Sequence, residues 1–265
     1  MEKIINQLYQ IRWWFLVLIN KFSFKENNQN FTLYKEWDFS KTDFPSLSKD
    51  FQFTPPWGKK INKRHPSKFD ERGVQITSEG ITFNNILNPD EDNIENPFIC
   101  GGIISKKSNL FPRYGKVEAL IKIYRRQGNW PAFWVTDTLN AMPEIDIYEF
   151  FGFPPDYKYG ASRRRLATNI HYGTRYDSLK YKFEQSLSYY FPPKLDQVWL
   201  KWSCEFYPNK IIVKINGIPV YQTSKATISN ERVVWVNGGA WYDAVNEDMG
   251  PSSEVKYLKY YKLND

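Results

Sequence analysis

The sequence Glu144-Ile145-Asp146-Ile147-Tyr148-Glu149 places three carboxylates within six residues, among β-branched and aromatic side chains. This composition favours a β-strand that carries acids. Side chains alternate between the faces of a strand, so Glu144 and Asp146 share one face and Glu149 lies on the other unless one residue is looped out. A β-bulge at Tyr148 or its neighbour would bring all three acids to one face, and bulges are common beside active sites.

Three acids on one face suit the hydrolysis of glycosidic bonds. Their mutual repulsion raises the affinity of at least one of them for a proton. A retaining glycosidase needs one ionised carboxylate as nucleophile and one protonated carboxyl as acid, roughly 5–5.5 Å apart. Glu144 and Glu149 would therefore have to lean inward over Asp146. From these residues alone, an edge strand with a solvated acidic face is the alternative interpretation.

The surrounding sequence distinguishes between the two interpretations. The run Trp130-Pro131-Ala132-Phe133-Trp134 precedes the acids, and further motifs keep one order along the chain: Tyr114-Gly115-Lys116-Val117-Glu118-Ala119, His171-Tyr172-Gly173, Ile215-Asn216-Gly217, Asn237-Gly238-Gly239 and a strand from Val255 to Tyr261. Together they resemble the signature of glycoside hydrolase family 16, E-[ILV]-D-x-x-E after W-P-A-F-W, over about residues 34–262.

The resemblance implies a retaining, endo-acting glycosidase. It gives Glu144 the role of nucleophile, Glu149 that of acid and base, and Asp146 that of tuning both. It also implies substrate-binding residues around the acids: Trp130, Trp134, His171, Trp235, Asn237 and Trp241. For Trp134 and His171, packing in the core is the alternative.

We expect no cofactor and no metal. Many family members carry an Asp that helps to ligate a structural calcium where this sequence has Lys256, and an ammonium group cannot ligate Ca²⁺. The only histidines are His65 and His171, and the only cysteines are Cys100 and Cys204, which is too few for a His/Cys metal cluster. We expect both cysteines to be buried free thiols.

Many short strands with turns between them predict an all-β fold. Residues 73–83 have the pattern of a hairpin, residues 99–105 and 116–124 read as strands, and Asn216-Gly217 is a two-residue hairpin signal. Residues 38–57 suggest a long irregular connection. We expect an antiparallel two-sheet β-sandwich of jelly-roll type, concanavalin A-like, with an open substrate cleft.

The chain divides into an N-terminal segment, residues 1–30, and a catalytic domain, residues 31–265. The apolar run Trp13–Ile19 has seven residues, whereas about 20 are needed to span a bilayer. Arg12 abuts the run and no small-residue cleavage site follows, so it makes a poor signal peptide. A helix at a membrane interface, a degenerate export signal and a segment that packs on the domain stay open as interpretations.

Composition limits the partners. The net charge of +7 is compatible with an anionic partner such as nucleic acid, a membrane surface or a sulfated polysaccharide. The aromatic content of 18% suits a polysaccharide whose sugar rings stack on aromatic side chains. No nucleic-acid-binding fingerprint occurs and the basic residues are spread along the chain, so we expect no nucleic acid partner. We expect a monomer that acts outside the producing cell, by an export route that the sequence leaves open.

The substrate is the least determined feature. The extra residue between Asp146 and Glu149 is similar to the bulged subgroup of the family, which includes laminarinases and agar or sulfated-galactan hydrolases, rather than to the unbulged lichenases. Within this subgroup we expect a β-1,3-glucan or a mixed β-1,3/1,4-glucan. A red-algal galactan such as agar, porphyran or carrageenan is the alternative, and Arg163–Arg165 favour a sulfated one. A transglycosylase and a catalytically inactive carbohydrate-binding relative complete the alternatives.

Overall fold

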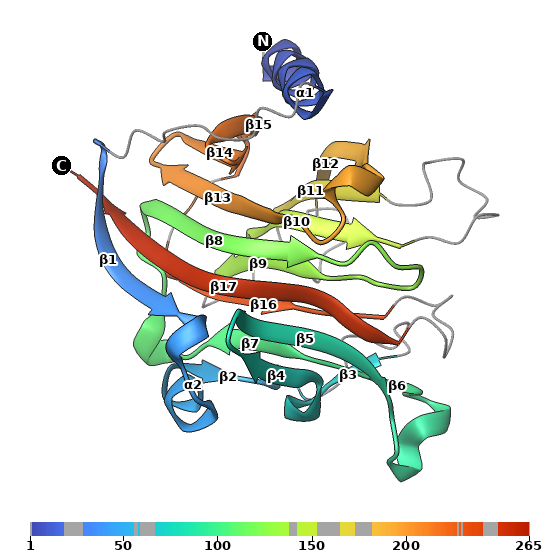
Figure 1. The fold of residues 1–265 in the computed structure, drawn as a ribbon. Helices are drawn as coiled ribbons and strands as arrows, with labels where there is room; N and C mark the ends of the chain where they lie inside the picture. Colours follow the sequence, from blue (N-terminus) through green and yellow to red (C-terminus); the bar gives the residue numbers. More distant parts are fainter. Residues whose placement is uncertain are drawn as a thin grey trace.

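Two stacked β-sheets form the body of the protein in the computed structural model (Figure 1). The structure describes residues 2–18, 29–55, 58, 67–137, 142–152, 165–172, 182–226, 228, 230–240 and 249–264. Nearly all strand pairs are antiparallel, and the described exception joins Ser67–Phe69 to Phe98–Cys100. The expected all-β sandwich of two sheets is confirmed.

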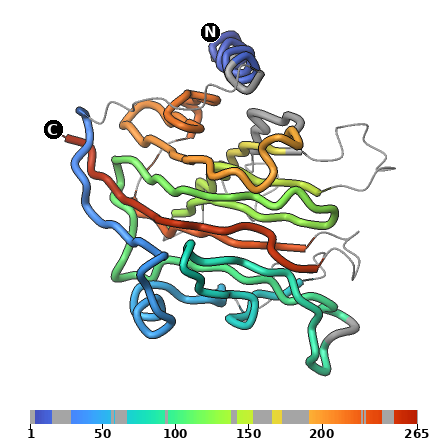
Figure 2. The backbone as a smooth tube through the Cα atoms, viewed as in Figure 1, coloured from blue at the N-terminus to red at the C-terminus, as the bar shows by residue number. Residues whose placement is uncertain are grey.

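The larger sheet has ten strands. Its neighbouring strands are, in order, β15 (Ile218–Thr223), β14 (Lys210–Ile215), β13 (Trp199–Tyr207), β8 (Gly115–Ile123), β17 (Gly250–Leu263), β5 (Gly80–Leu87), β6 (Phe98–Cys100) and β3 (Ser67–Phe69). Strand β1 (Phe31–Asp38) also pairs with β17, and β4 (Val74–Thr77) pairs with β5. Figure 2 shows β1 and β17 running side by side, so the first and the last strand of the sandwich are joined.

The smaller sheet has seven strands and carries the acids. Its order is β12 (Lys182–Tyr190), β11 (Arg165–Tyr172), β10 (Glu144–Phe151), β9 (Ala132–Asp137), β16 (Arg232–Asn237), β7 (Gly102–Ser105) and β2 (Phe51–Gln52). Two α-helices, α1 (Glu2–Leu18) and α2 (Phe44–Asp50), and five 3-10 turns complete the described elements: η1 (Phe39–Lys41), η2 (Glu71–Gly73), η3 (Glu91–Ile94), η4 (Lys107–Asn109) and η5 (Pro193–Leu195).

The core lies between the two sheets, because each strand turns every second side chain inward. In β8 these are Val117, Ala119, Ile121 and Ile123, all buried, as the alternation of the sequence predicts. The hairpin expected over residues 73–83 is confirmed as β4 and β5. Asn216 and Gly217 both have positive φ between β14 and β15, which is the turn that their dipeptide predicts.

Two local expectations were wrong. Residues 99–105 do not form one strand, because the chain changes sheets at Gly101 between β6 and β7. A Cβ atom at Gly101 would lie only 2.1 Å from the carbonyl oxygen of Gly73, so the close approach of the two segments requires glycine. Residues 38–57 include helix α2, which Asp43 caps by accepting a hydrogen bond from the backbone N–H of Ser46 at 2.8 Å.

The N-terminal helix α1 packs against the edge strand β15 of the ten-stranded sheet. Trp13 is buried in this contact. The side chain of Asn6 both donates to the carbonyl oxygen of Gln222 at 2.9 Å and accepts from its N–H at 2.8 Å. Among the described residues, no helix combines the length and the apolar character needed to cross a membrane.

Candidate active site

A β-bulge in β10 brings the three carboxylates to one face. Ile147 and Tyr148 follow one another and yet are both buried in the core between the sheets. Strand β9 provides no partner for Ile147 between the pairs made by Asp146 and Tyr148, so Ile147 is the extra residue. Glu149 therefore returns to the face that carries Glu144 and Asp146. The bulge that the sequence analysis expected is present, at the neighbour of Tyr148.

His171 joins two of the acids. Strand β11 pairs with β10 so that His171 lies opposite Glu144. The Nε2 atom of His171 is 3.2 Å from Oδ2 of Asp146 and 3.7 Å from Oε1 of Glu144. The side chains of Glu144 and His171 are 14% and 18% exposed, so a substrate can reach both from solvent. A hydrogen on Nε2 of His171 would donate a hydrogen bond to Oδ2 of Asp146 and so fix the orientation of that carboxylate.

Glu149 is held by hydrogen bonds to both of its carboxylate oxygens. The indole Nε1 of Trp130 donates to Oε1 at 3.2 Å, and the amide Nδ2 of Asn169 donates to Oε2. Trp130 precedes β9 in the chain. Asn169 was missed by sequence reasoning. Its position two residues before His171, on the same face of β11, was the available signal.

The surroundings of Glu149 favour its protonated form. Burial raises the pKa of Glu149 well above its usual range, and the negative charges of Asp146 and Glu144 raise it further. His171 and the amide of Asn169 oppose the shift but do not cancel it. Glu149 therefore keeps a proton at a pH where an ordinary glutamate has lost it. A carboxyl of this kind can act as a general acid.

Two stacked tryptophans lie beside the acids. Trp134 is opposite Asp146 in β10 and opposite Trp235 in β16, and the two indole rings stack at 4.3 Å with an interplanar angle of 15°. Trp134 is partly exposed and donates from Nε1 to Oδ1 of Asn237 at 2.8 Å. This places the ring of Trp134 next to the acids, where a sugar ring could stack on it.

The structure places the other expected substrate-binding residues differently. Trp235 is only 2% exposed, and its Nε1 donates a hydrogen bond to the hydroxyl of Thr136 at 3.1 Å. One face of its ring packs against Trp134, so Trp235 supports the position of Trp134. Asn237 is also buried, and its amide oxygen is engaged by Trp134. Trp241, Arg163 and Arg164 lie outside the described residues.

Two parts of the protein bear on metal binding: the cluster of acids with His171, and the position of Lys256. One ligand atom each from Glu144, Asp146 and His171 lies within 4.8 Å of the others, which is a spacing that a cation could use. Lys256, at the position that the resemblance links to calcium, holds its ammonium 5.9 Å from the ring centroid of Trp199. A calcium ion does not fit beside that cation.

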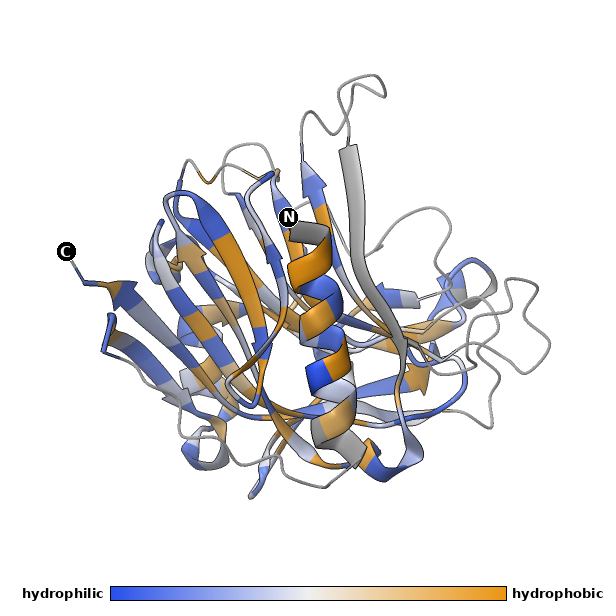
Figure 3. Ribbon diagram, turned by 90° about the horizontal axis from the view of Figure 1, so that it is seen from above, coloured by the Kyte–Doolittle hydropathy of each residue, from blue (hydrophilic) through white to orange (hydrophobic). Residues whose placement is uncertain are grey.

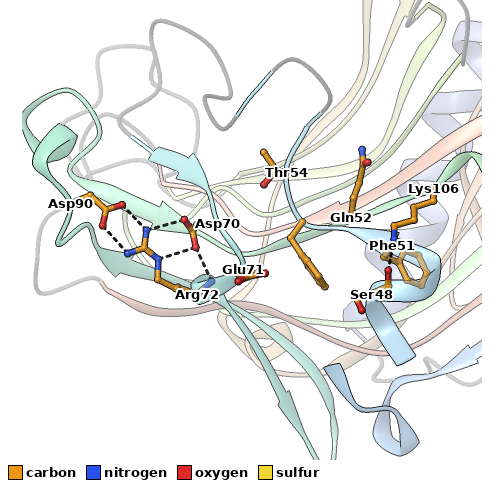
Figure 4. A pocket seen from close by; sticks show the side chains of 10 residues that line it. Ser48, Phe51, Gln52, Thr54, Asp70, Glu71, Arg72, Asp90 and Lys106 are labelled. Atoms are coloured by element: carbon orange, nitrogen blue, oxygen red, sulfur yellow. Dashed lines mark hydrogen bonds and ion pairs between the residues drawn. The ribbon is translucent and has the colours of Figure 1, made fainter. Parts of the chain in front are cut away.

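A groove of about 850 Å³ lies at the far edge of the same sheet. Its lining includes Gln52 in β2 and Phe53 just after it. Figure 4 shows the acidic residues Asp70 and Glu71 beside Arg72 on one side of the groove. Arg72 crosses this wall with its guanidinium group between Asp70, at 2.8 Å, and Asp90, at 2.6 Å. Its charge is therefore balanced within the wall of the groove.

The register of the strands relates this groove to the acids. Across the sheet, Asp146 pairs with Trp134, Trp134 with Trp235, Trp235 with Ile104 and Ile104 with Gln52. Residues paired in register point to the same side, so Gln52 belongs to the face that carries Asp146. Four strand spacings of about 4.8 Å separate the two by roughly 19 Å.

Comparison with known proteins identifies the family. The sequence matches the model of glycosyl hydrolases family 16 over residues 58–259. The chain belongs to this family. It is therefore a glycoside hydrolase by family. The order of motifs around the three acids agrees with that assignment. A search of curated protein sequences finds no match to this family 16 chain.

Solved structures of family 16 enzymes share the fold. The κ-carrageenase of Zobellia galactanivorans superposes with a TM-score of 0.71 at 17% identity, covering 92% of this chain and 99% of its own. The laminarinase catalytic domain of Thermotoga maritima gives 0.68 at 14%, with coverages of 89% and 100%. The mixed-linkage glucan enzyme of Bacteroides ovatus gives 0.65 at 20%, with 85% and 98%. At these identities the similarity shows the fold and leaves the substrate open.

Proposed function

We propose that this family 16 chain is a retaining, endo-acting β-glycosidase whose substrate is a β-1,3-glucan or a mixed β-1,3/1,4-glucan. The observation that carries the proposal is the asymmetry of the acids on β10. Glu149 has a pKa raised by burial and by its two acidic neighbours, whereas Glu144, whose side chain is 14% exposed, lies within 3.7 Å of the His171 imidazole. One acid is thus prepared to give a proton and another to attack.

The chemistry has two steps. In the first, a carboxylate oxygen of Glu144 forms a bond to the anomeric carbon while the glycosidic C–O bond breaks, and Glu149 gives its proton to the leaving oxygen. In the second, Glu149 takes a proton from water as the water oxygen attacks the same carbon and releases Glu144. Asp146, held by His171, lies between the two acids in sequence and on their face.

An endo-acting mode is supported by the position of the groove at β2. Gln52, which lines this groove, is on the face of the acids and roughly 19 Å from Asp146 at about 4.8 Å per strand, so a polymer that crosses the strands would reach both. A neutral glucan is supported by the charge of the groove wall, where Asp70 and Asp90 already balance Arg72. A sulfated chain would meet Glu71 without a surplus of cations there.

A sulfated red-algal galactan is the second candidate. The net charge of +7 favours an anionic polymer, and one similar structure is a κ-carrageenase. Binding that weakens strongly as salt is raised would distinguish this candidate, because salt screens attraction between exposed charges. Either substrate is a large polymer, which favours action outside the producing cell.

The direct test is release of reducing ends from laminarin, mixed-linkage glucan, agarose, porphyran and carrageenan. Activity on one of the two glucans, abolished in Glu144→Gln and in Glu149→Gln, is the expected result. Activity on a galactan alone would refute the glucan assignment and retain the mechanism. Binding to any polymer without hydrolysis would refute the enzyme and support an inactive carbohydrate-binding relative.

A further inference from the structure

Helix α1 carries an apolar stripe on the side that faces away from the β-sandwich. Ile4, Leu8, Ile11 and Phe15 are 63%, 59%, 65% and 59% exposed. Their spacings of four, three and four residues place them on one face of the helix. They are half of the eight large hydrophobic residues found exposed in the described part of the chain. A concentration of this kind on one face marks an interaction surface.

The opposite face of α1 is fixed to the protein, so the helix cannot turn over to bury the stripe. Trp13 is only 2% exposed. Asn6 exchanges two hydrogen bonds with the backbone of Gln222, which occupies the free edge of β15. Figure 3 shows α1 lying outside the strands, with hydrophobic and hydrophilic residues alternating along it. The stripe is therefore held outward by contacts made on the other face.

The chemistry around the stripe fits a lipid surface. Arg12 is exposed, one position along from Ile11, and the one acid in the helix is Glu2 in its first turn. The chain as a whole carries a net charge of +7. A helix with an apolar face, flanking cations and aromatic side chains is typical of those that lie in the headgroup region of a bilayer. A positively charged protein adds attraction to anionic lipids.

We propose that the stripe of Ile4, Leu8, Ile11 and Phe15 lies on an anionic lipid bilayer and holds the enzyme at that surface. The helix has 17 residues and packs on β15 along its other face, which is consistent with lying on the membrane rather than crossing it. Its partner strand belongs to the ten-stranded sheet, whereas the acids belong to the seven-stranded one. Membrane binding would thus use a surface separate from the one that binds polysaccharide.

The test is co-sedimentation of the full chain with vesicles of phosphatidylcholine alone and of phosphatidylcholine mixed with phosphatidylglycerol. The wild type should bind the mixed vesicles more tightly than the neutral ones. The double substitution Leu8→Gln and Ile11→Gln should weaken that binding by about tenfold or more, because two large apolar side chains lose their burial. The matched control is Leu33→Gln with Leu87→Gln, two leucines that are 48% and 52% exposed on strands and should leave binding unchanged.

Three outcomes would overturn the proposal. In the first, the Leu8→Gln and Ile11→Gln variant binds the mixed vesicles as tightly as the wild type. In the second, the strand control loses as much vesicle binding as the helix variant. In the third, the wild type binds neutral and anionic vesicles equally. A lipid-free dimer that dissociates in the helix variant, without vesicle binding by the wild type, would assign the stripe to a second copy instead. Hydrolysis of soluble polysaccharide should be unchanged in the helix variant, so failure of this proposal is separate from failure of the proposed activity.

Discussion

Replacing Asn169 with leucine should extend the activity of the enzyme to higher pH. The amide of Asn169 donates a hydrogen bond to Oε2 of Glu149, and this bond favours the ionised carboxylate and so lowers its pKa. Leucine has a similar shape and no N–H. Without the bond, the pKa of Glu149 rises further, and the protonated form that the first step requires persists at higher pH.

The size of the effect follows from the strength of the bond. A hydrogen bond to a charged group contributes about 1.5–3 kcal/mol, and one pKa unit corresponds to about 1.36 kcal/mol. The lower end of this range corresponds to about one pKa unit, and we take it as the expected shift. The alkaline limb of the kcat/KM profile should therefore move up by about one pH unit.

The assay is the initial rate of reducing-end release at a series of pH values, for the wild type and Asn169→Leu. The acid limb, which reports ionisation of the nucleophile, should stay in place. Thr168→Val is the matched control, since Thr168 is the next residue, is buried, and donates to the carbonyl oxygen of Ile147 on the core side. A limb that stays fixed or moves down in Asn169→Leu would refute the assignment of Glu149 as the acid.

Three further substitutions probe other parts of the account. His171→Gln should lower kcat by about tenfold to a hundredfold, because the bond that orients Asp146 is to a charged group worth about 1.5–3 kcal/mol. Gln52→Ala should raise KM for the polymer by about twofold to tenfold and leave short oligosaccharides unaffected, as expected for the loss of a hydrogen bond of about 0.5–1.5 kcal/mol in the groove. Gly80→Ala should lower the free energy of unfolding, measured by denaturant titration, by about 1–3 kcal/mol. The φ angle of Gly80 is +149°, and a Cβ atom there would lie 2.2 Å from the carbonyl oxygen of Val255.

Two of these substitutions have a control in the chain. Glu79→Ala changes the exposed neighbour of Gly80 and should leave stability nearly unchanged. Tyr34→Ala removes a ring that is exposed on β1, in the other sheet, and should not alter KM. An unchanged kcat in His171→Gln would show that Asp146 does not depend on the imidazole.

Features with a local cause were predictable from the sequence. The strand that carries the acids is predicted by its β-branched and aromatic residues. The bulge is predicted because side chains alternate between faces, so Glu149, five positions after Glu144, reaches the same face only if one residue is looped out. The hairpin at Asn216-Gly217 follows from the need for positive φ at both positions. In each case the residues that determine the structure are neighbours in sequence.

Features that depend on distant residues were not predictable in this way. The bond from Asn169 to Glu149 joins residues 20 positions apart and requires the register of β10 and β11. The stacking of Trp235 on Trp134 depends on how β16 pairs with β9. The docking of α1 likewise depends on Asn6 meeting the edge of β15, 216 residues away.

The most direct test of the central claim is the anomeric configuration of the first product, followed by proton NMR during early hydrolysis of the glucan that the enzyme accepts. Attack by Glu144 followed by water predicts that the β-anomer appears first and then mutarotates. Initial release of the α-anomer would contradict the account, because it would mean that water attacks directly and that Glu144 forms no bond to the sugar.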